Sequence, residues 1–262
     1  MYIDERKDLF RNSGNRSNPY RIMLILLMIV VLVAFLRGYT RGEVWPPFVP
    51  TPTPTRTVNS FITEGQTHFQ AGDLTKAIES FNKALLLEPE NTDVSVELSR
   101  ILAYSSSSLT TDQERRDSLN QALSVIDAAK TLEPTNANVL AMRSFVLSWL
   151  SNPTLSGELS EDYRNQAEAE ALAAIQLDPA NALAKAYYAE VVIDQYKLVQ
   201  AQDYIAQALS SGEDLMDVRR VQAYIYEILG EYNLAIEWYQ KAIEVTPNLT
   251  FLYIRVGVLY RH

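Results

Sequence analysis

The chain has 262 residues, of which 47% are hydrophobic, and it contains no cysteine. The lack of thiols excludes disulfides, thiolate metal sites and a cysteine nucleophile in this sequence, but it does not identify a redox compartment. The first 42 residues hold 7 basic and 3 acidic residues, whereas the remainder holds 16 basic and 29 acidic ones. An acidic body argues against nucleic acid as a partner, because phosphate binding needs a basic surface.

Residues 22–36 are fifteen consecutive apolar residues with an arginine on each side. At about 1.5 Å per residue this run is shorter than a hydrocarbon core of ~30 Å. Asn18 and Pro19 are suited to cap and begin a helix, which would lengthen it. We therefore predict a single N-terminal transmembrane helix over residues 19–40. A cleaved signal peptide and a buried core helix are the alternatives.

Basic residues are concentrated before the apolar run. Five precede it (Arg6, Lys7, Arg11, Arg16, Arg21), and three follow it at wider spacing (Arg37, Arg41, Arg56). Because basic residues favour the cytoplasmic side, the tail formed by residues 1–18 is predicted to be cytoplasmic. The predicted location is the cell membrane, with a single pass and everything after the helix extracytoplasmic.

Residues 41–57 are rich in proline and threonine, and five prolines lie between residues 43 and 57. This stretch has no helical periodicity, so an extended polyproline-type linker is expected. At ~3.1 Å per residue, residues 43–57 could span roughly 45 Å. Two interpretations are open: a stalk that presents a binding surface, and a simple joint that keeps two elements apart.

A pattern of 34 residues begins at residue 58 and recurs, with modifications, to the end of the chain. In its first copy small residues stand where two antiparallel helices would touch: Gly65, Ala77 and Ala84. Apolar residues recur around them at helical spacing. Gly72 marks the turn between the helices, Pro89 ends the second helix, and Asn91 is placed to cap the next one.

This pattern resembles the tetratricopeptide repeat, whose signature places are occupied by Gly65, Gly72, Ala77, Phe81, Ala84 and Pro89. The resemblance implies an all-α fold, a right-handed α-solenoid of helix pairs over residues 58–262. The units are 58–91, 92–136, 137–181, 182–215 and 216–249, followed by an incomplete sixth unit, 250–262. A solenoid normally ends on a polar cap, and this sequence ends on an apolar helix pattern, so we expect it to be a fragment.

The second and third units each carry eleven extra residues. Because the alanines of their second helices stay in phase with the closing proline, the extra residues are expected between the two helices. The polar tracts 105–111 and 151–160 fit that position. Thr111 and Glu114 form a capping box, so the second helices are expected to be longer as well. The result would be a raised lip on one edge of two adjacent units.

Little in the sequence points to catalysis. His68 and His262 are the only histidines, and the nine glycines are scattered, so a histidine triad and a phosphate-binding loop are both unsupported. Paired carboxylates such as Glu168 and Glu170 are better explained by a solvated helix face than by acid/base chemistry. We predict no enzyme activity, no catalytic residue, no cofactor, no metal site and no small-molecule substrate.

The remaining candidate is a surface. In the resembled family, first helices line a concave groove that receives a peptide or a partner helix. The basic clamp with which some members hold C-terminal carboxylates is absent from the corresponding positions. Aromatic residues instead recur at helical spacing, and the repeat register turns three toward the concave side and one to its margin. The predicted partner-binding residues are Phe145, Trp149 and Tyr224, with Tyr187 at the margin. Packing in the core is the alternative for Trp149.

These patterns predict a membrane-anchored scaffold that binds partner proteins or peptides through the concave face of its repeats. An alternative is the substrate-recruiting arm of a larger enzyme whose catalytic domain lies beyond residue 262. A third possibility is a purely structural assembly factor in an envelope complex. The sequence does not name the partner, the pathway or the oligomeric state.

Overall fold

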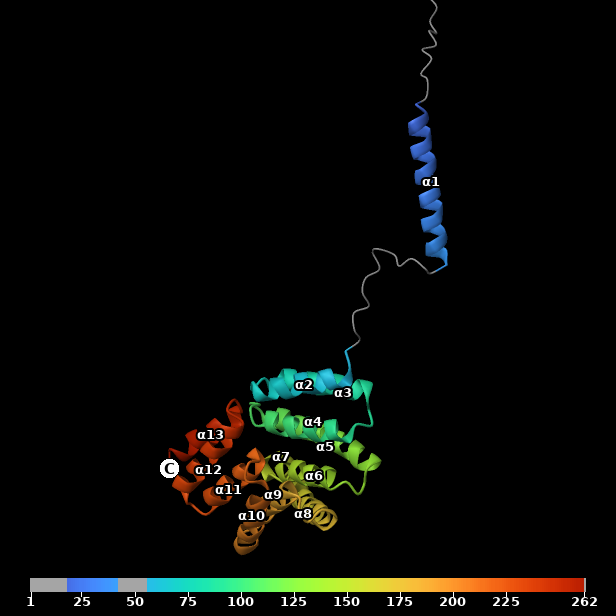
Figure 1. Cartoon of the computed structure of the whole chain (residues 1–262). Coiled ribbons are helices and arrows are strands. Elements are labelled where there is room, and N and C mark those ends of the chain that lie inside the picture. The colour runs from blue at the N-terminus through green and yellow to red at the C-terminus, as the bar shows by residue number, and fades with distance from the viewer. Residues whose placement is uncertain (1–17, 42–55, 262) are drawn as a thin grey trace, which may run out of the picture. The chain divides into compact units, whose positions relative to one another are not determined.

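The computed structural model describes residues 18–41 and 56–261, which belong to two separate units (Figure 1). The tail over residues 1–17 and most of the predicted linker, residues 42–55, lie outside the described residues. Every regular element in the described residues is a helix.

The first unit contains one long helix, α1 (Pro19–Thr40), of 22 residues. Asn18 caps it as predicted, since its side-chain oxygen accepts a hydrogen bond from the Tyr20 backbone N–H at 3.1 Å, and Pro19 opens the first turn. At about 1.5 Å per residue the helix is roughly 33 Å long. In the described part of the chain it alone is long and apolar enough to cross a membrane, a test that a signal sequence also passes.

The second unit is a stack of antiparallel helix pairs. Each first helix packs against the second helix of its own unit: α2 with α3, α4 with α5, α6 with α8, α9 with α10, and α11 with α12. The bounds are α2 (Val58–Gln70), α3 (Leu74–Leu87), α4 (Thr92–Ser106), α5 (Asp112–Leu132), α6 (Ala137–Leu150), α7 (Pro153–Ser156), η1 (Gly157–Leu159), α8 (Ser160–Leu177), α9 (Ala182–Asp194), α10 (Leu198–Gly212), α11 (Met216–Ile228), α12 (Tyr232–Val245) and α13 (Thr250–Leu259).

Small residues let the paired helices approach closely. A Cβ atom added at Gly65 would lie 2.7 Å from Cε2 of Phe81, so glycine is needed where α2 crosses α3. Ala77 and Ala84, predicted to lie at helix contacts, are buried, and so are the alanines at the equivalent places of other second helices: Ala122, Ala129, Ala235 and Ala242. The core of the stack is therefore built from helix–helix contacts that leave no room for larger side chains.

Helix caps follow the expected polar residues. The side chains of Asn91, Asn136 and Asn181 accept hydrogen bonds from the first backbone N–H groups of α4, α6 and α9. Thr111 and Glu114 form the predicted capping box at the start of α5. Gly72 has a φ of 79°, a left-handed conformation that glycine adopts without steric cost, at the turn between α2 and α3.

The insertions lie between the paired helices and lengthen the second ones, as predicted. Helices α5 and α8 have 21 and 18 residues, whereas α3 and α12 have 14 each. The third unit also gains the short helix α7 and the 3₁₀ turn η1, which the sequence pattern did not anticipate.

The stack curves until its first and later units meet. The side-chain amide of Asn248, in the loop before α13, donates a hydrogen bond to the carbonyl oxygen of Gln70 at the end of α2, at 2.7 Å. Figure 1 shows α13 returning beside the turn between α2 and α3. The first helices therefore surround a narrow interior rather than an open groove.

Candidate partner-binding site

Aromatic rings from four units meet on the concave side. Tyr104 lies 5.5 Å from both Phe145 and Trp149, measured between ring centroids, and Phe145 stacks on Tyr187 at 4.8 Å. Phe251 of α13 reaches Trp149 at 5.5 Å. Such offset and edge-on contacts contribute about 0.5 to 1.5 kcal/mol per pair beyond burial. This aromatic cluster fills the centre of the curved stack.

Charged groups lie within the same interior. Asp217 of α11 accepts hydrogen bonds from the hydroxyl groups of Tyr104 and Tyr187, the latter at 3.1 Å, and from Nη1 of Arg100 at 3.2 Å. Asp217 is only 2% exposed. These contacts connect the second, fourth and fifth units through one carboxylate.

Arg220 and Glu190 form the second charged contact. The Arg220 guanidinium donates to both carboxylate oxygens of Glu190, at 2.7 and 2.6 Å, and its Nε donates to the Tyr104 hydroxyl at 3.0 Å. Burial opposes the Arg220 charge, but Glu190, Tyr104 and Asp217 together outweigh burial and raise the pKa of Arg220. Burial raises the pKa of Tyr104 well above its ordinary value, so this hydroxyl stays protonated and donates to Asp217.

The structure brings three of the four predicted site residues together. Phe145 and Tyr187 are fully buried inside the aromatic cluster, while Trp149 is half-buried at its side. Tyr224 is half-buried and turns elsewhere, since its hydroxyl donates to Asp194 at 2.6 Å. Any direct contact of Phe145 or Tyr187 with a partner would require the stack to open, and their binding role stays a prediction.

A cavity of about 490 Å³ adjoins the aromatic cluster on the concave side. All five complete units supply first-helix residues to its wall. They are Gln66, Phe69 and Gln70 from α2, Val96, Glu97, Arg100 and Ile101 from α4, Met142 from α6, Leu183 from α9, and Met216 and Asp217 from α11. Such a volume is typical of sites that accept a small ligand or a few peptide residues.

Arg100 is the central polar group of this wall. Its guanidinium donates to Glu97 at 2.6 Å and to Asp217, and it lies over the Phe69 ring with Cζ 5.0 Å from the centroid. Its Nε atom is buried and has no hydrogen-bond partner among the described residues. A ligand that supplies an acceptor could satisfy this group.

The charged residues of this site were not predicted from the sequence. Arg100, Phe145, Glu190 and Tyr224 occupy the same place in four successive first helices, and Tyr104, Trp149 and Asp194 follow three of them by four residues. Aligning the units would have revealed this stripe, because residues four apart share a helix face. In residues 18–41 and 56–261, no three His, Asp or Glu side chains gather closely enough to hold a metal ion.

Comparisons with known proteins agree with the stack of antiparallel helix pairs in the structure. Two stretches, residues 58–91 and 221–249, match models described as the tetratricopeptide repeat (TPR). A crystal structure of a thermophilic TPR protein from Thermus thermophilus superposes with a TM-score of 0.60 at 20% identity, covering 79% of this chain and all of that one. The chain contains tetratricopeptide repeats.

Other solved structures resemble the chain less closely. A tetratricopeptide repeat protein from Parabacteroides merdae ATCC 43184 is 21% identical with a TM-score of 0.39, covering 78% of this chain and 72% of that one. The MamA protein is 18% identical with a TM-score of 0.40, covering 72% and 91%. No curated protein matches the sequence. The comparisons therefore show the TPR fold, and interaction with other proteins is what such repeats generally do.

Proposed function

We propose that this TPR protein is a membrane-anchored scaffold that binds a partner protein or peptide in the concave cavity. The observation that carries the proposal is the cavity itself, because first helices of five units contribute to one wall. Its rim carries the exposed amides of Gln66 and Gln70, and its floor carries Phe69 and Met142. This combination of apolar floor and polar rim suits an extended peptide segment.

The aromatic cluster supports the cavity from behind. Phe145 stacks on Tyr187, whose hydroxyl donates to Asp217, while Trp149 and Tyr224 retain partly exposed surface. We propose that the partner contacts the cavity wall first, and that Phe145, Trp149 and Tyr187 lie behind this wall. A rigid floor reduces the entropy cost of binding.

We further propose that α1 is retained as an anchor, with the N-terminus in the cytoplasm and the repeats on the other side. Its length of roughly 33 Å fits a hydrocarbon core of ~30 Å. Arg21 stands near the helix start and Arg37 near its end, where both can extend toward the membrane surfaces. The excess of basic residues before the helix supports this orientation.

Site-directed photocrosslinking tests the binding site. A photoreactive amino acid at Gln66 or Gln70 should capture one stoichiometric partner in membranes, because both side chains stand on the cavity rim. The matched control is Glu79, an exposed residue of α3 that does not line the cavity. Equal capture from Glu79 and Gln66, or capture from neither, would contradict the concave site.

Topology mapping tests the anchor. A reporter fused after His262 should be active only outside the cytoplasm, and the protein should stay with membranes during carbonate extraction. A soluble mature form that begins near residue 40 would show that α1 is a cleaved signal.

A further inference from the structure

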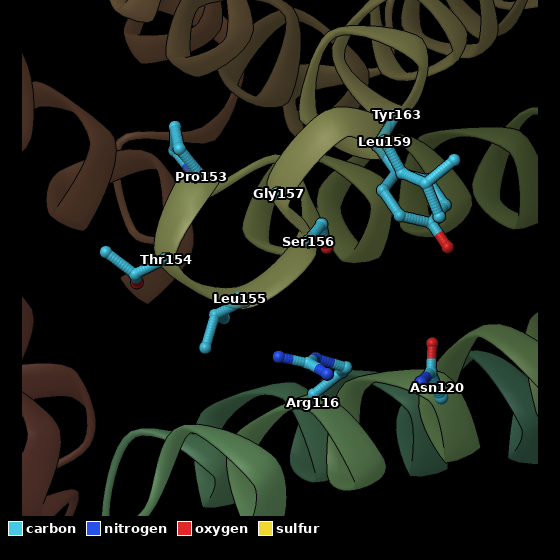
Figure 2. Close-up of a pocket in the computed structure, with 9 residues that line it drawn as sticks. All are labelled: Arg116, Asn120, Pro153, Thr154, Leu155, Ser156, Gly157, Leu159 and Tyr163. Carbon is cyan, nitrogen blue, oxygen red and sulfur yellow. The ribbon is translucent and has the colours of Figure 1, made fainter.

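A second cavity lies away from the concave side, between the two insertions (Figure 2). It has a volume of about 420 Å³, and we call it the insertion cavity. One wall is the N-terminal part of α5, with Arg116 and Asn120, and the other is the segment from Pro153 to Tyr163. Since the longer α5, helix α7 and turn η1 all come from the extra residues, the cavity exists only because the second and third units depart from the regular repeat.

The upper wall in Figure 2 is held in place by its own contacts. Leu155 is 7% exposed and packs into the hydrophobic core, and Asn152 caps α7 by accepting from the Thr154 backbone N–H at 3.0 Å. The Ser160 hydroxyl donates to the carbonyl oxygen of Ser151 across the base of the loop. Packing and hydrogen bonds together make this loop a preformed wall.

Arg116 is the unusual side chain of the lower wall. Its Nε atom is buried without a hydrogen-bond partner, and its guanidinium makes only a long contact of 3.5 Å to Gln113. No ion pair involves Arg116 among the described residues. Arg164 and Arg261 likewise form no ion pair, whereas the seven other arginines in residues 56–261 have carboxylate partners: Arg56, Arg100, Arg115, Arg143, Arg219, Arg220 and Arg255. The repeats are acidic overall. An arginine that faces a cavity in such a domain, and that has no carboxylate partner, can bind an anion there.

Neutral polar groups share the cavity with Arg116. Figure 2 shows the Asn120 side chain and the Tyr163 hydroxyl pointing toward one another from the two walls. The side chains of Asn120, Ser156 and Tyr163 have no hydrogen-bond partner within the described residues, so each is available to a ligand. None of the nine lining residues is acidic, although acidic residues dominate the repeats.

Apolar groups complete the lining. Pro153, Leu155 and Leu159 present hydrocarbon surface beside the polar groups, and Leu159 is 56% exposed. Gly157 adopts a φ of 55°, and a Cβ atom added there would meet nothing within 4 Å, so no side chain fills this part of the loop. A ligand with one anionic group next to an apolar group would match both parts of the cavity.

We propose that the insertion cavity binds a peptide carboxylate, at a chain terminus or on an acidic side chain, with an apolar residue beside it. Arg116 would hold the carboxylate, and Asn120 and Tyr163 would donate to it, because a planar guanidinium pairs well with a carboxylate. A phosphate dianion fits less well, since the cavity offers a single cation and the surrounding domain is acidic. This site is independent of the concave cavity and extends the scaffold to a second contact.

The test is a titration of the full chain in detergent micelles, followed through the Nε–Hε resonance of Arg116. The probes are acetyl-Leu-Leu with a free carboxylate, its C-terminal amide, acetyl-Leu-Glu-amide and inorganic phosphate. The free carboxylate probe, the glutamate probe or both should shift the resonance, whereas the neutral amide should not. Which of the two binds tells whether a chain terminus or an acidic side chain is recognised. No shift with either carboxylate, or a shift with phosphate alone, would overturn the proposal.

Matched variants localise the binding. Arg116→Gln should weaken the carboxylate probe about tenfold or more, as expected when a charged hydrogen bond is lost. Arg115→Gln, one residue away, should leave affinity unchanged, because Arg115 already pairs with Asp112 and the carbonyl oxygen of Leu109. Tyr163→Phe keeps the ring and should weaken binding severalfold, which provides a second test should Arg116→Gln disturb the fold. For the two arginine variants the titration is read from backbone amides of α5. Equal affinities in all three variants would disprove the site.

Discussion

The hydroxyl of Tyr104 in the second repeat donates a hydrogen bond to Asp217 in the fifth, across 113 residues of sequence. The same carboxylate accepts from Tyr187 and Arg100, so units that are not neighbours in the chain are held together at one buried group. In a regular solenoid each repeat contacts only its neighbours. This chain therefore stabilises its curvature with contacts between distant repeats.

Asp217→Ala is expected to destabilise the repeats strongly. The substitution leaves Arg100 with one carboxylate fewer and two buried hydroxyls without their acceptor, and losing one partner of a buried pair typically costs ~3 to 5 kcal/mol. Urea denaturation followed by circular dichroism measures this cost. Asp214→Ala is the control, since Asp214 is solvent-exposed and pairs only with Arg219. Similar losses in both variants would show that the buried contacts do not hold the stack.

Trp149→Ala should reduce stability by about 3 kcal/mol, the loss typical of a large aromatic residue removed from a packed site. Trp149 packs edge-on against Tyr104 and Phe145 and also contacts Phe251. Leu86→Ala, at a side chain that is 80% exposed, should change the melting temperature little. If Trp149→Ala leaves stability unchanged and weakens partner capture instead, Trp149 is a surface contact rather than a core residue.

Gly65 and Gly257 stand at equivalent places in the first helices of the first and sixth units, but only Gly65 packs against a second helix. An added methyl group at Gly65 would meet the Phe81 ring at 2.7 Å, whereas one at Gly257 would meet nothing within 4 Å. Gly65→Ala should therefore cost ~1 to 3 kcal/mol through strain. Gly257→Ala should stabilise α13 by about 0.5 to 1 kcal/mol, because alanine favours helices. If both substitutions raised the melting temperature, or both lowered it, the difference in packing between Gly65 and Gly257 would be contradicted.

Asp194 should make stability depend on pH. Burial raises its pKa to about 6, although the hydrogen bond from Tyr224 opposes the shift; Glu190 adds to the rise, and Arg164 and Arg220 reduce it. Between the unfolded pKa near 3.8 and the folded value, the native state binds more protons, so stability falls as pH rises. The loss is on the order of 2 kcal/mol. Melting temperatures from pH 4 to 7 should fall less in Asp194→Asn, and identical slopes would exclude Asp194 as the cause.

The local features of the fold were predictable because they depend on short stretches. The period of 34 residues predicted helix pairs, Asn91 predicted a cap, and Ala84 predicted a close contact, each from residues within one unit. Thr111 and Glu114 likewise predicted the longer second helix. Sequence spacing is sufficient for such features, since helix geometry relates residues three and four apart directly.

The candidate site was predictable only in part, because it depends on curvature. The repeat register turned Phe145 and Trp149 toward the concave side, and both lie there, but nothing in their own unit showed that Tyr104 and Phe251 would cover them. A small rotation between successive units adds up over the stack, so contacts across the interior cannot be inferred from one repeat. The hydrogen bond from Arg220 to the Tyr104 hydroxyl is one such contact.

The hydrogen bond from Asn248 to Gln70 bears on how the molecule opens. End repeats of an open stack fray, and their amide protons exchange faster than those of central repeats. Here the turn at Gly72 lies against Asn248, so the first helix pair has neighbours on two sides. Amide exchange in α2 and α3 should therefore be nearly as slow as in the central helices. Asn248→Ala should speed exchange in the first repeat while leaving α8 unchanged.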